Sequence, residues 1–156
     1  MRRNDREITD NREIERFISD QQIMRVGMYD NGEVYIVPVN YGFKAENGAY
    51  TFYFHGACAG RKYELALSKP NVGFEIDGGF SLLPAEKACG YSARYQSVIG
   101  SGVLSVVLDE AEKTEALSCL MKQLTGKSGF TYDEAMLRAT AVFRLEVARL
   151  SCKAKQ

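Results

Sequence analysis

The stretch IMRVGMYDNGEVYIVPVNYGFKAENGAYTFYF, residues 23–54, decides the fold class. It contains runs of β-branched and aromatic residues that Asn31-Gly32 and Asn47-Gly48 separate. Asn-Gly is the strongest short signal for a β-hairpin, because both central residues of the turn need positive φ. We therefore expect an antiparallel meander whose strands lie at residues 23–29, 33–40 and 49–54.

Further strands follow in the second half of the chain. Residues 71–77 have strand character and run into a Gly-rich loop at Asp77-Gly78-Gly79. The β-rich stretch 91–108 is interrupted by glycines at positions 100 and 102, which indicate a bend or a bulge. Residues 140–150 are expected to form the closing strand.

Helices are expected between these strands. Asp10 and Asp109 can each cap a helix, and Glu13 and Glu112 stand three residues further on, as in a capping box. The helix after Asp109 carries an apolar stripe that ends at Gly126. Two shorter helices are expected at residues 60–69, ahead of Pro70, and from Thr131 onward.

The predicted architecture is a single mainly β (α+β) domain over residues 1–156. About six short strands with hairpin turns favour a closed or half-closed antiparallel barrel, because closure removes exposed sheet edges. The helices would flank this barrel.

The composition is that of a folded, charge-balanced domain. Hydrophobic residues make up 46% and charged residues 26% of the chain, which is enough to build a core. Equal numbers of basic and acidic residues give a formal charge of zero, so we expect no nucleic acid and no membrane as a partner. With neither a membrane span nor an apolar leader in the sequence, the cytoplasm is the expected location.

A metal site is not expected. The four cysteines show no C-x-x-C pair, and His55 is the only histidine. We expect reduced and mostly buried thiols at Cys58, Cys89, Cys119 and Cys152.

Common catalytic templates are also missing. The sequence has no G-x-S-x-G motif, and Gly126-Lys127-Ser128 has Met121 where a P-loop needs glycine. Gly100-Ser101-Gly102 has Ser105 where a dinucleotide-binding turn needs its third glycine. These gaps argue against α/β-hydrolases, P-loop NTPases and Rossmann enzymes.

The densest candidate site is FYFHGACAGRK, residues 52–62. A strand ends near His55, and a helix begins near Gly60-Arg61-Lys62, where free N–H groups and two cations would suit a phosphate. Alternatively, Arg61 and Lys62 are ordinary solvated residues. His55 is either a hydrogen-bonded strand-end residue or an active group.

Two other segments are unusual for a plain sheet. Pro38, in Val37-Pro38-Val39-Asn40-Tyr41, cannot donate to a strand ladder, so it marks an edge or a bulge. The backbone groups left free there could bind a flat ligand, or the strand is simply an edge. Arg94-Tyr95-Gln96-Ser97-Val98 combines a cation, an aromatic ring and a hydroxyl group, or is plain sheet surface.

In this order, the segments resemble the pyridoxamine 5′-phosphate oxidase-like flavoproteins, and specifically their nitroimidazole-resistance (Nim) group. The resemblance covers nearly the whole chain. It rests on Met1-Arg2-Arg3 with Arg6-Glu7-Ile8, Gly27-Met28, residues 35–42 (YIVPVNYG), Tyr53-Phe54-His55, Gly60-Arg61-Lys62, residues 71–75 (NVGFE) and residues 95–102 (YQSVIGSG).

The resemblance implies a six-stranded split β-barrel homodimer with two FMN molecules at the subunit interface. The isoalloxazine ring would lie against Val37, Pro38, Val39 and Asn40. The phosphate would be held by Gly60, Arg61 and Lys62. The flavin would also be approached by Tyr95, Ser97 and Ile99, either from the partner strand or from the same wall of the site. His55 would lie close to both the flavin and a small-molecule substrate.

The implied activity is that of an FMN-dependent reductase. Electrons would pass from NAD(P)H or another carrier to an electron-poor acceptor such as a nitroaromatic compound, with His55 donating a proton or a hydrogen bond. Three alternatives remain: a flavin carrier or redox sensor without turnover, a pyridoxamine-phosphate-oxidase-like enzyme with another substrate, and a haem protein that uses His55.

Overall fold

The computed structural model of the protein describes residues 4–155. Met1-Arg2-Arg3, one segment of the resemblance, lies outside the described residues. The strands are β1 (Glu7–Ile8), β2 (Met24–Asp30), β3 (Glu33–Val39), β4 (Gly42–Glu46), β5 (Ala49–Ala57), β6 (Asn71–Leu83), β7 (Ser92–Val107) and β8 (Thr140–Lys155). The α-helices are α1 (Asn11–Asp20), α2 (Arg61–Leu67), α3 (Glu110–Thr125) and α4 (Glu134–Ala139).

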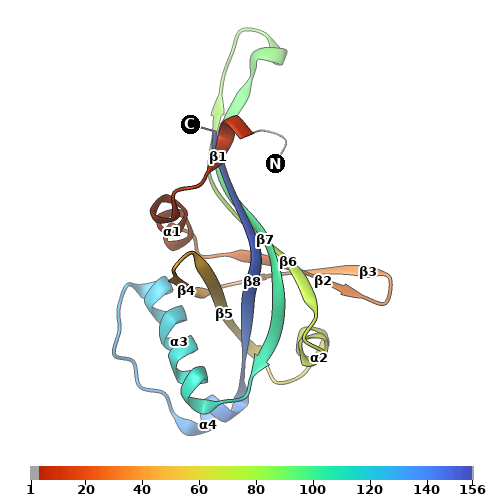
Figure 1. Ribbon diagram of the computed structural model, residues 1–156, viewed down its shortest axis with the longest axis vertical. Helices are drawn as coiled ribbons and strands as arrows, with labels where there is room; N and C mark the ends of the chain where they lie inside the picture. The colour runs from red at the N-terminus through yellow and green to blue at the C-terminus, as the bar shows by residue number, and fades with distance from the viewer. Residues whose placement is uncertain (1–3, 156) are drawn as a thin grey trace.

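The strands form one curled antiparallel sheet in the order β3-β2-β6-β7-β8-β5-β4, and β1 pairs with the end of β8 (Figure 1). This confirms the expected class, a mainly β fold with flanking helices. The strand count was wrong, because the sheet has eight strands instead of six. The short β1 was not expected, and β4 forms a separate strand ahead of the second hairpin turn.

Both Asn-Gly pairs form the hairpin turns that the sequence predicts. Asn31 and Gly32 have φ values of 48° and 96° between β2 and β3, and Asn47 and Gly48 have 52° and 81° between β4 and β5. Two successive positive φ angles match the right-handed twist of the flanking strands. The turns therefore fix the register of both hairpins.

The helix signals are confirmed as well. The side chains of Asp10 and Asp109 accept hydrogen bonds from backbone N–H groups at the starts of α1 and α3. Gly126 ends α3 in the left-handed conformation, with a φ of 69°. The short α4 begins at Glu134, after the cap residue Asp133, three residues later than the expected start at Thr131.

The main hydrophobic core lies inside the curl of the sheet. Phe54 and Phe143 stack there with ring centroids 5.1 Å apart, and both side chains are almost fully buried. A smaller cluster on the outer face of β5 joins Tyr53 to Ala116 of α3. Helix α3 thus covers the outer face of β5, so β5 has buried side chains on both faces.

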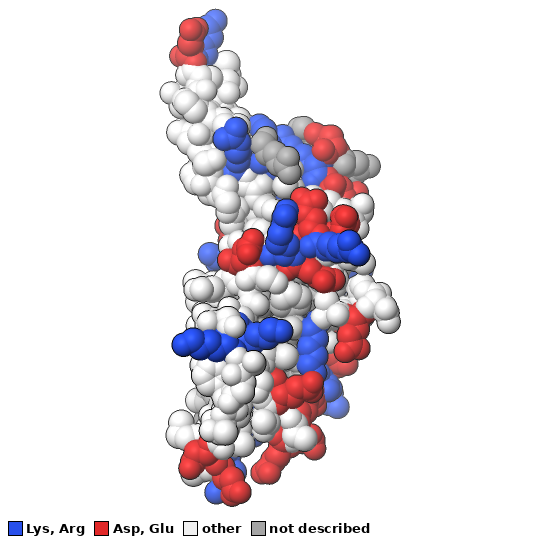
Figure 2. All heavy atoms as spheres, turned by 90° about the vertical axis from the view of Figure 1, so that its left-hand side faces the viewer, with Lys and Arg blue, Asp and Glu red and all other residues white. Residues whose placement is uncertain are grey.

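β6 and β7 continue beyond the rest of the sheet as a projecting arm, residues 79–94 (Figure 1). The prediction of a Gly-rich loop at Asp77-Gly78-Gly79 was wrong. These residues lie within β6, beside a register shift between Gly78 and Ser81. Phe80 on this arm is 74% exposed. Figure 2 shows the arm as an uncharged column with charged side chains at its tip.

The glycine prediction in β7 is confirmed. The register with β8 shifts between Ser101 and Gly102, and a Cβ atom at Gly102 would collide with the carbonyl oxygen of Glu146. Only glycine allows the two backbones to approach so closely at this bulge.

All four cysteines are free thiols, but the expected burial holds for only part of the set. Cys152 is buried and Cys119 is half-buried, whereas Cys58 and Cys89 are exposed. Cys58 lies in the loop before α2, and Cys89 lies on the arm, so neither has a core to pack against.

Candidate functional site

A half-buried lysine marks the start of α2. The Nζ atom of Lys62 lies 5.5 Å from the ring centre of Phe54 and 5.0 Å from that of Phe143. It also donates a 3.4 Å hydrogen bond to the backbone oxygen of His55. Lys62 therefore rests on the aromatic end of the core and faces the end of β5.

Gly56 makes room for this lysine. A Cβ atom at position 56 would lie 2.9 Å from the Nζ atom of Lys62, so the end of the lysine side chain would have to shift away. Sequence reasoning did not single out Gly56. A glycine inside a strand is, however, the usual signal of a close approach, and it could have pointed to this contact.

The charge of Lys62 lacks an acidic partner. Among residues 4–155, no carboxylate forms an ion pair with it, and burial lowers its pKa. A desolvated cation on aromatic rings favours an anionic ligand that can supply the missing charge. Helix α2 has only seven residues, so the side-chain charge matters more here than a helix dipole.

Arg61 points to different partners. Its guanidinium donates to Asp30 at 2.6 Å and to Glu33 at 3.0 Å, and it lies 4.7 Å from the ring centre of Tyr35. The hydrogen bonds to Asp30 and Glu33 raise the pKa of Arg61. Arg61 therefore ties α2 to the β2–β3 hairpin, and sequence reasoning missed these acidic partners because they lie about thirty residues earlier.

The predicted flavin-wall segment forms the free edge of the sheet. Val37, Pro38 and Val39 end β3, which pairs only with β2 among the described strands. Pro38 is exposed and Val39 is buried. Asn40 follows the strand and donates a 2.9 Å hydrogen bond to the backbone oxygen of Gln22. The expectation that Pro38 marks an edge is confirmed.

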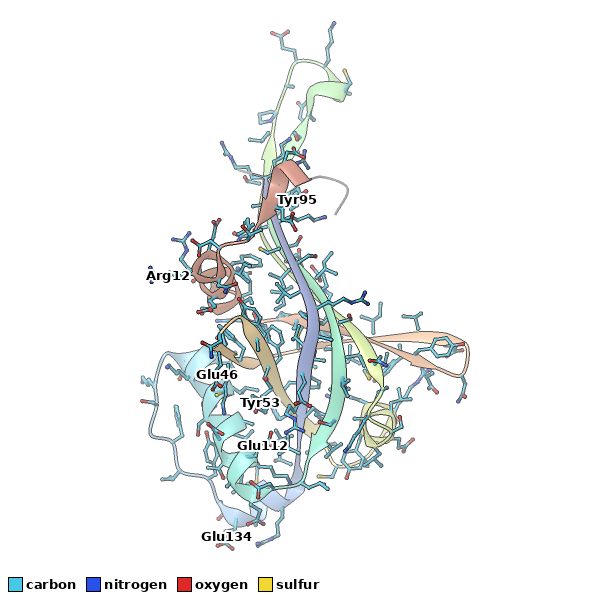
Figure 3. The ribbon with its side chains drawn as sticks, in the orientation of Figure 1. Arg12, Glu46, Tyr53, Tyr95, Glu112 and Glu134 are labelled. Atoms are coloured by element: carbon cyan, nitrogen blue, oxygen red, sulfur yellow. The ribbon has the colours of Figure 1, made fainter. Side chains whose placement is uncertain are left out.

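His55 lies on the other face of β5 from Lys62. Successive strand residues point to opposite faces, so Phe54 and Gly56 face the core while His55 faces α3 and α4. There it lines a cavity of about 190 Å³ between β5 and the two helices. Further along the same face of β5, the ring of Tyr53 is buried under α3, and its hydroxyl group donates to Glu112 of that helix at 3.4 Å; Figure 3 labels both residues.

The three predicted residues of β7 lie elsewhere in the chain. Figure 3 places Tyr95 at the base of the arm, where Arg6 donates to its hydroxyl group at 3.1 Å. Ser97 is 8% exposed, and its hydroxyl group has no hydrogen-bond partner within the described residues. Ile99 is 48% exposed on the outer face of the sheet.

The predicted site residues therefore form three groups in one chain. The first surrounds the start of α2 and the end of β5: His55, Gly60, Arg61 and Lys62. Tyr95 and Ser97 lie toward the opposite end of the molecule, next to β1 (Figures 1 and 3), and Ile99 lies in the middle of β7. Val37–Asn40 lies along the edge of the sheet formed by β3. The other end of β3 contacts Arg61 through Glu33.

Comparison with known protein families assigns this chain to one of them. The sequence profile described as pyridoxamine 5′-phosphate oxidase matches residues 10–154. The chain belongs to this family. The family that the sequence resembles is thus confirmed. Membership accounts for the order of the segments on which the resemblance rests. A comparison with curated protein sequences gave no significant match.

Solved structures share the family fold. A candidate 5-nitroimidazole antibiotic resistance protein from Bacteroides thetaiotaomicron is 29% identical, with a TM-score of 0.80, over 96% of this chain and 90% of that one. The flavocytochrome Anf3 from Azotobacter vinelandii is 23% identical, with a TM-score of 0.82, over 100% and 72%. An FAD and heme binding protein from Mycobacterium smegmatis is 16% identical, with a TM-score of 0.82, over 97% and 74%. These likenesses confirm the split-barrel fold.

Residues 4–155 contain neither a cluster of metal ligands nor a helix that could span a membrane. Within residues 4–155, no three His, Cys, Asp or Glu side chains gather as metal ligands would. No described helix has the length and apolar character needed to cross a membrane.

The uncompensated charge of Lys62 predicts a stability effect. Burial lowers the pKa of Lys62 in the folded state, so the unfolded chain binds the proton more tightly. The folded state is therefore penalised while Lys62 is charged, and the penalty fades as pH rises through the folded pKa toward the unfolded one. Lys62→Met should raise the urea midpoint of the ligand-free protein at pH 7, and less so at alkaline pH.

The exposed Lys127 provides a matched control. Lys127→Met should leave the urea midpoint nearly unchanged at both pH values. A lower midpoint for Lys62→Met at pH 7 would show that the charge of Lys62 stabilises the ligand-free fold.

Proposed function

We propose that this protein is an FMN-dependent oxidoreductase that reduces electron-poor small molecules such as nitroaromatics. The observation that carries the proposal is Lys62, a half-buried cation with no acidic partner in the described chain. Membership of the pyridoxamine 5′-phosphate oxidase family supports it. The nitroaromatic substrate rests on the nitroimidazole-resistance name of the 29%-identical Bacteroides protein.

Lys62 is the residue that we assign to the FMN phosphate. A dianionic phosphate would replace the acidic partner that this lysine lacks, in a charge-assisted hydrogen bond. Gly56 keeps the space beside Nζ open. Arg61 already pairs with Asp30 and Glu33, so we assign it the role of holding the hairpin and α2 together. The other N–H groups of its guanidinium are left for the phosphate.

The free edge of β3 suits a flat heterocycle. Pro38 removes one backbone donor there, and the outward backbone groups of its neighbours have no strand partner in the described chain. FMN would supply the two-electron chemistry that protein side chains lack. Its ring, with both donors and acceptors, could pair with this edge along Val37–Asn40.

We assign His55 to the electron acceptor, as its hydrogen-bond or proton donor. Conversion of a nitro group to a nitroso group and water takes up two electrons and two protons. An exposed imidazole at the mouth of a cavity can donate a hydrogen bond or a proton to the reducing oxygen. NAD(P)H, bound transiently, is the electron donor that we propose.

A homodimer with FMN at its interface would unite the three groups of site residues. In one chain, Tyr95 and Ser97 lie at the β1 end of β7, away from the start of α2, and the hydroxyl group of Ser97 lacks a partner within the described residues. The strand registers place Ile99 and Ile36 on the same outer face of the sheet. These side chains are 48% and 60% exposed, and a second copy could cover them.

We also propose the cytoplasm as the location. Exposed free thiols at Cys58 and Cys89 are compatible with a reducing compartment.

FMN binding tests the phosphate assignment. Wild-type protein should become yellow and quench flavin fluorescence on titration with FMN. Lys62→Met should bind FMN about ten- to a hundredfold more weakly, because it lacks a charge-assisted contact worth roughly 1.5–3 kcal/mol. Lys127→Met is the control, and equal affinity in both variants would contradict the assignment.

Turnover separates an enzyme from a flavin carrier. With FMN bound, NAD(P)H should bleach the flavin absorbance, and a nitroaromatic compound should restore it over repeated cycles. His55→Ala should lower the rate of this reoxidation about a hundredfold while FMN affinity changes little. If no donor supports turnover in a protein that binds FMN, the carrier alternative is correct.

The dimer is tested by solution mass. Ile36→Asp places a charge in the proposed interface, so it should convert a dimer into monomers and weaken FMN binding together. Leu108→Asp, at a residue that is 80% exposed outside this face, should leave the mass unchanged. A wild-type monomer that binds FMN at full affinity would refute the shared site.

A further inference from the structure

Two ribbons of the sheet project from the body of the molecule in different directions (Figure 1). One is the arm, residues 79–94, and the other is the hairpin that β2 and β3 form. A two-stranded ribbon is at best marginally stable in water on its own. Each ribbon would therefore be stabilised by a surface that covers it.

One face of the arm is apolar. Leu82 pairs with Ala93, and Phe80 and Tyr91 each lie two residues earlier, so strand alternation gathers these side chains on one face. An even spacing along β7 puts Ala93 on the same face as Ile99, which is the outer face of the sheet. The apolar face of the arm thus continues the outer face of the sheet.

The charged residues of the arm lie elsewhere. Arg94 pairs with Ser81, one residue from Leu82, so both point to the opposite face. Glu86 and Lys87 belong to the charged tip that Figure 2 shows.

The β2–β3 hairpin has the same character. Tyr29 pairs with Val34, and Ile36 lies two residues beyond Val34, so the three side chains share the outer face. Asp30 and Glu33, at the tip, form the next pair of the ladder and point to the other face, toward α2.

These side chains form what we call the outer apolar face: Tyr29, Val34, Ile36, Phe80, Leu82, Tyr91 and Ile99. They are seven of the twelve large hydrophobic side chains that are exposed within residues 4–155. At on the order of 100 Å² each, they present on the order of 700 Å², close to the ~800 Å² per partner of a standard interface. An apolar patch of this size on a soluble protein marks an interaction site.

The outer apolar face is complementary to itself. Consider a two-fold axis that lies in the plane of this face, between the directions of the arm and the hairpin in Figure 1. Rotation about it brings two copies face to face and superposes the arm of each on the hairpin of the other. An uncharged surface then meets an uncharged surface at both ends of the contact.

We propose that the outer apolar face binds a second copy of this chain, with the arm of each protomer packed on the β2–β3 hairpin of the other. This inference deepens the proposed function, on which it rests for the shared flavin site, by naming the element that reaches across. β3 is the free edge strand of the hairpin. The partner's arm would therefore wall the edge Val37–Asn40 that we assign to the flavin ring, and the site in one chain is incomplete without it.

Neighbouring residues on the two faces of the arm give a matched pair of variants. Leu82→Asp should raise the dimer dissociation constant at least about thirtyfold, because each dimer would bury two unpaired carboxylates, and it should weaken FMN binding as well. Ser81→Asp adds the same charge on the opposite, exposed face and should change neither. Equal masses for the two variants across a dilution series would overturn the proposal.

Photo-cross-linking locates the surface that the arm touches. Leu82→benzoylphenylalanine protein is mixed with ¹⁵N-labelled wild type, so that any cross-link to a labelled peptide joins two molecules. The expected labelled product is the tryptic peptide of residues 26–44, which contains the whole of β3. Cross-links that stay within one chain, or that fall on another labelled peptide, would refute the packing of arm on hairpin.

Flavin absorbance in the same samples keeps the two proposals apart. A dimer cross-linked from arm to hairpin that binds no FMN would support the packing and refute the flavin function. A protein that binds and turns over FMN, but is a monomer or cross-links elsewhere, would refute the packing and leave the flavin function standing.

Discussion

The structure depends on the antiparallel pairing of β7 with β8. Each strand has 16 residues, and the ladder runs from Tyr95 opposite Lys155 to Val107 opposite Val142. It spans the molecule, so it fixes the arm and β1 at one end relative to α3 and α4 at the other (Figure 1). The bulge at Gly102 bends this ladder, and a larger residue there would separate the strands and change the angle between the two ends.

Strand β5 divides the chemistry between its two faces. The alternation of side chains gives Lys62 the core face, over Phe54, and gives His55 the face toward α3. The half-buried ammonium group and the imidazole are thereby separated by one thickness of backbone. A shift of β5 by one residue would exchange these surroundings and bury the imidazole against the aromatic core.

Local signals in the sequence predicted the local structure well. The two Asn-Gly turns, the caps at Asp10 and Asp109 and the glycine bulge depend on neighbouring residues, and all were confirmed. The contacts between distant segments were not predictable in this way. The pairing of Arg61 with Asp30 and the cavity formed by α3 and α4 around His55 need the three-dimensional fold. The extension of β6 through Gly78 was missed because glycines next to Asp usually indicate a turn.

The projecting arm has a consequence for the chemistry of the protein in air. Cys89 lies near its tip, in the 3-10 helix Ala88–Gly90, and is exposed. A thiol that extends beyond the body of the molecule meets oxidants and other molecules before the half-buried Cys119 or the buried Cys152 does. A disulfide formed between two copies of Cys89 would join two molecules at their arms, far from the start of α2. Cys58, the other exposed thiol, lies in the loop just before α2, so an oxidation there would act beside Lys62 instead.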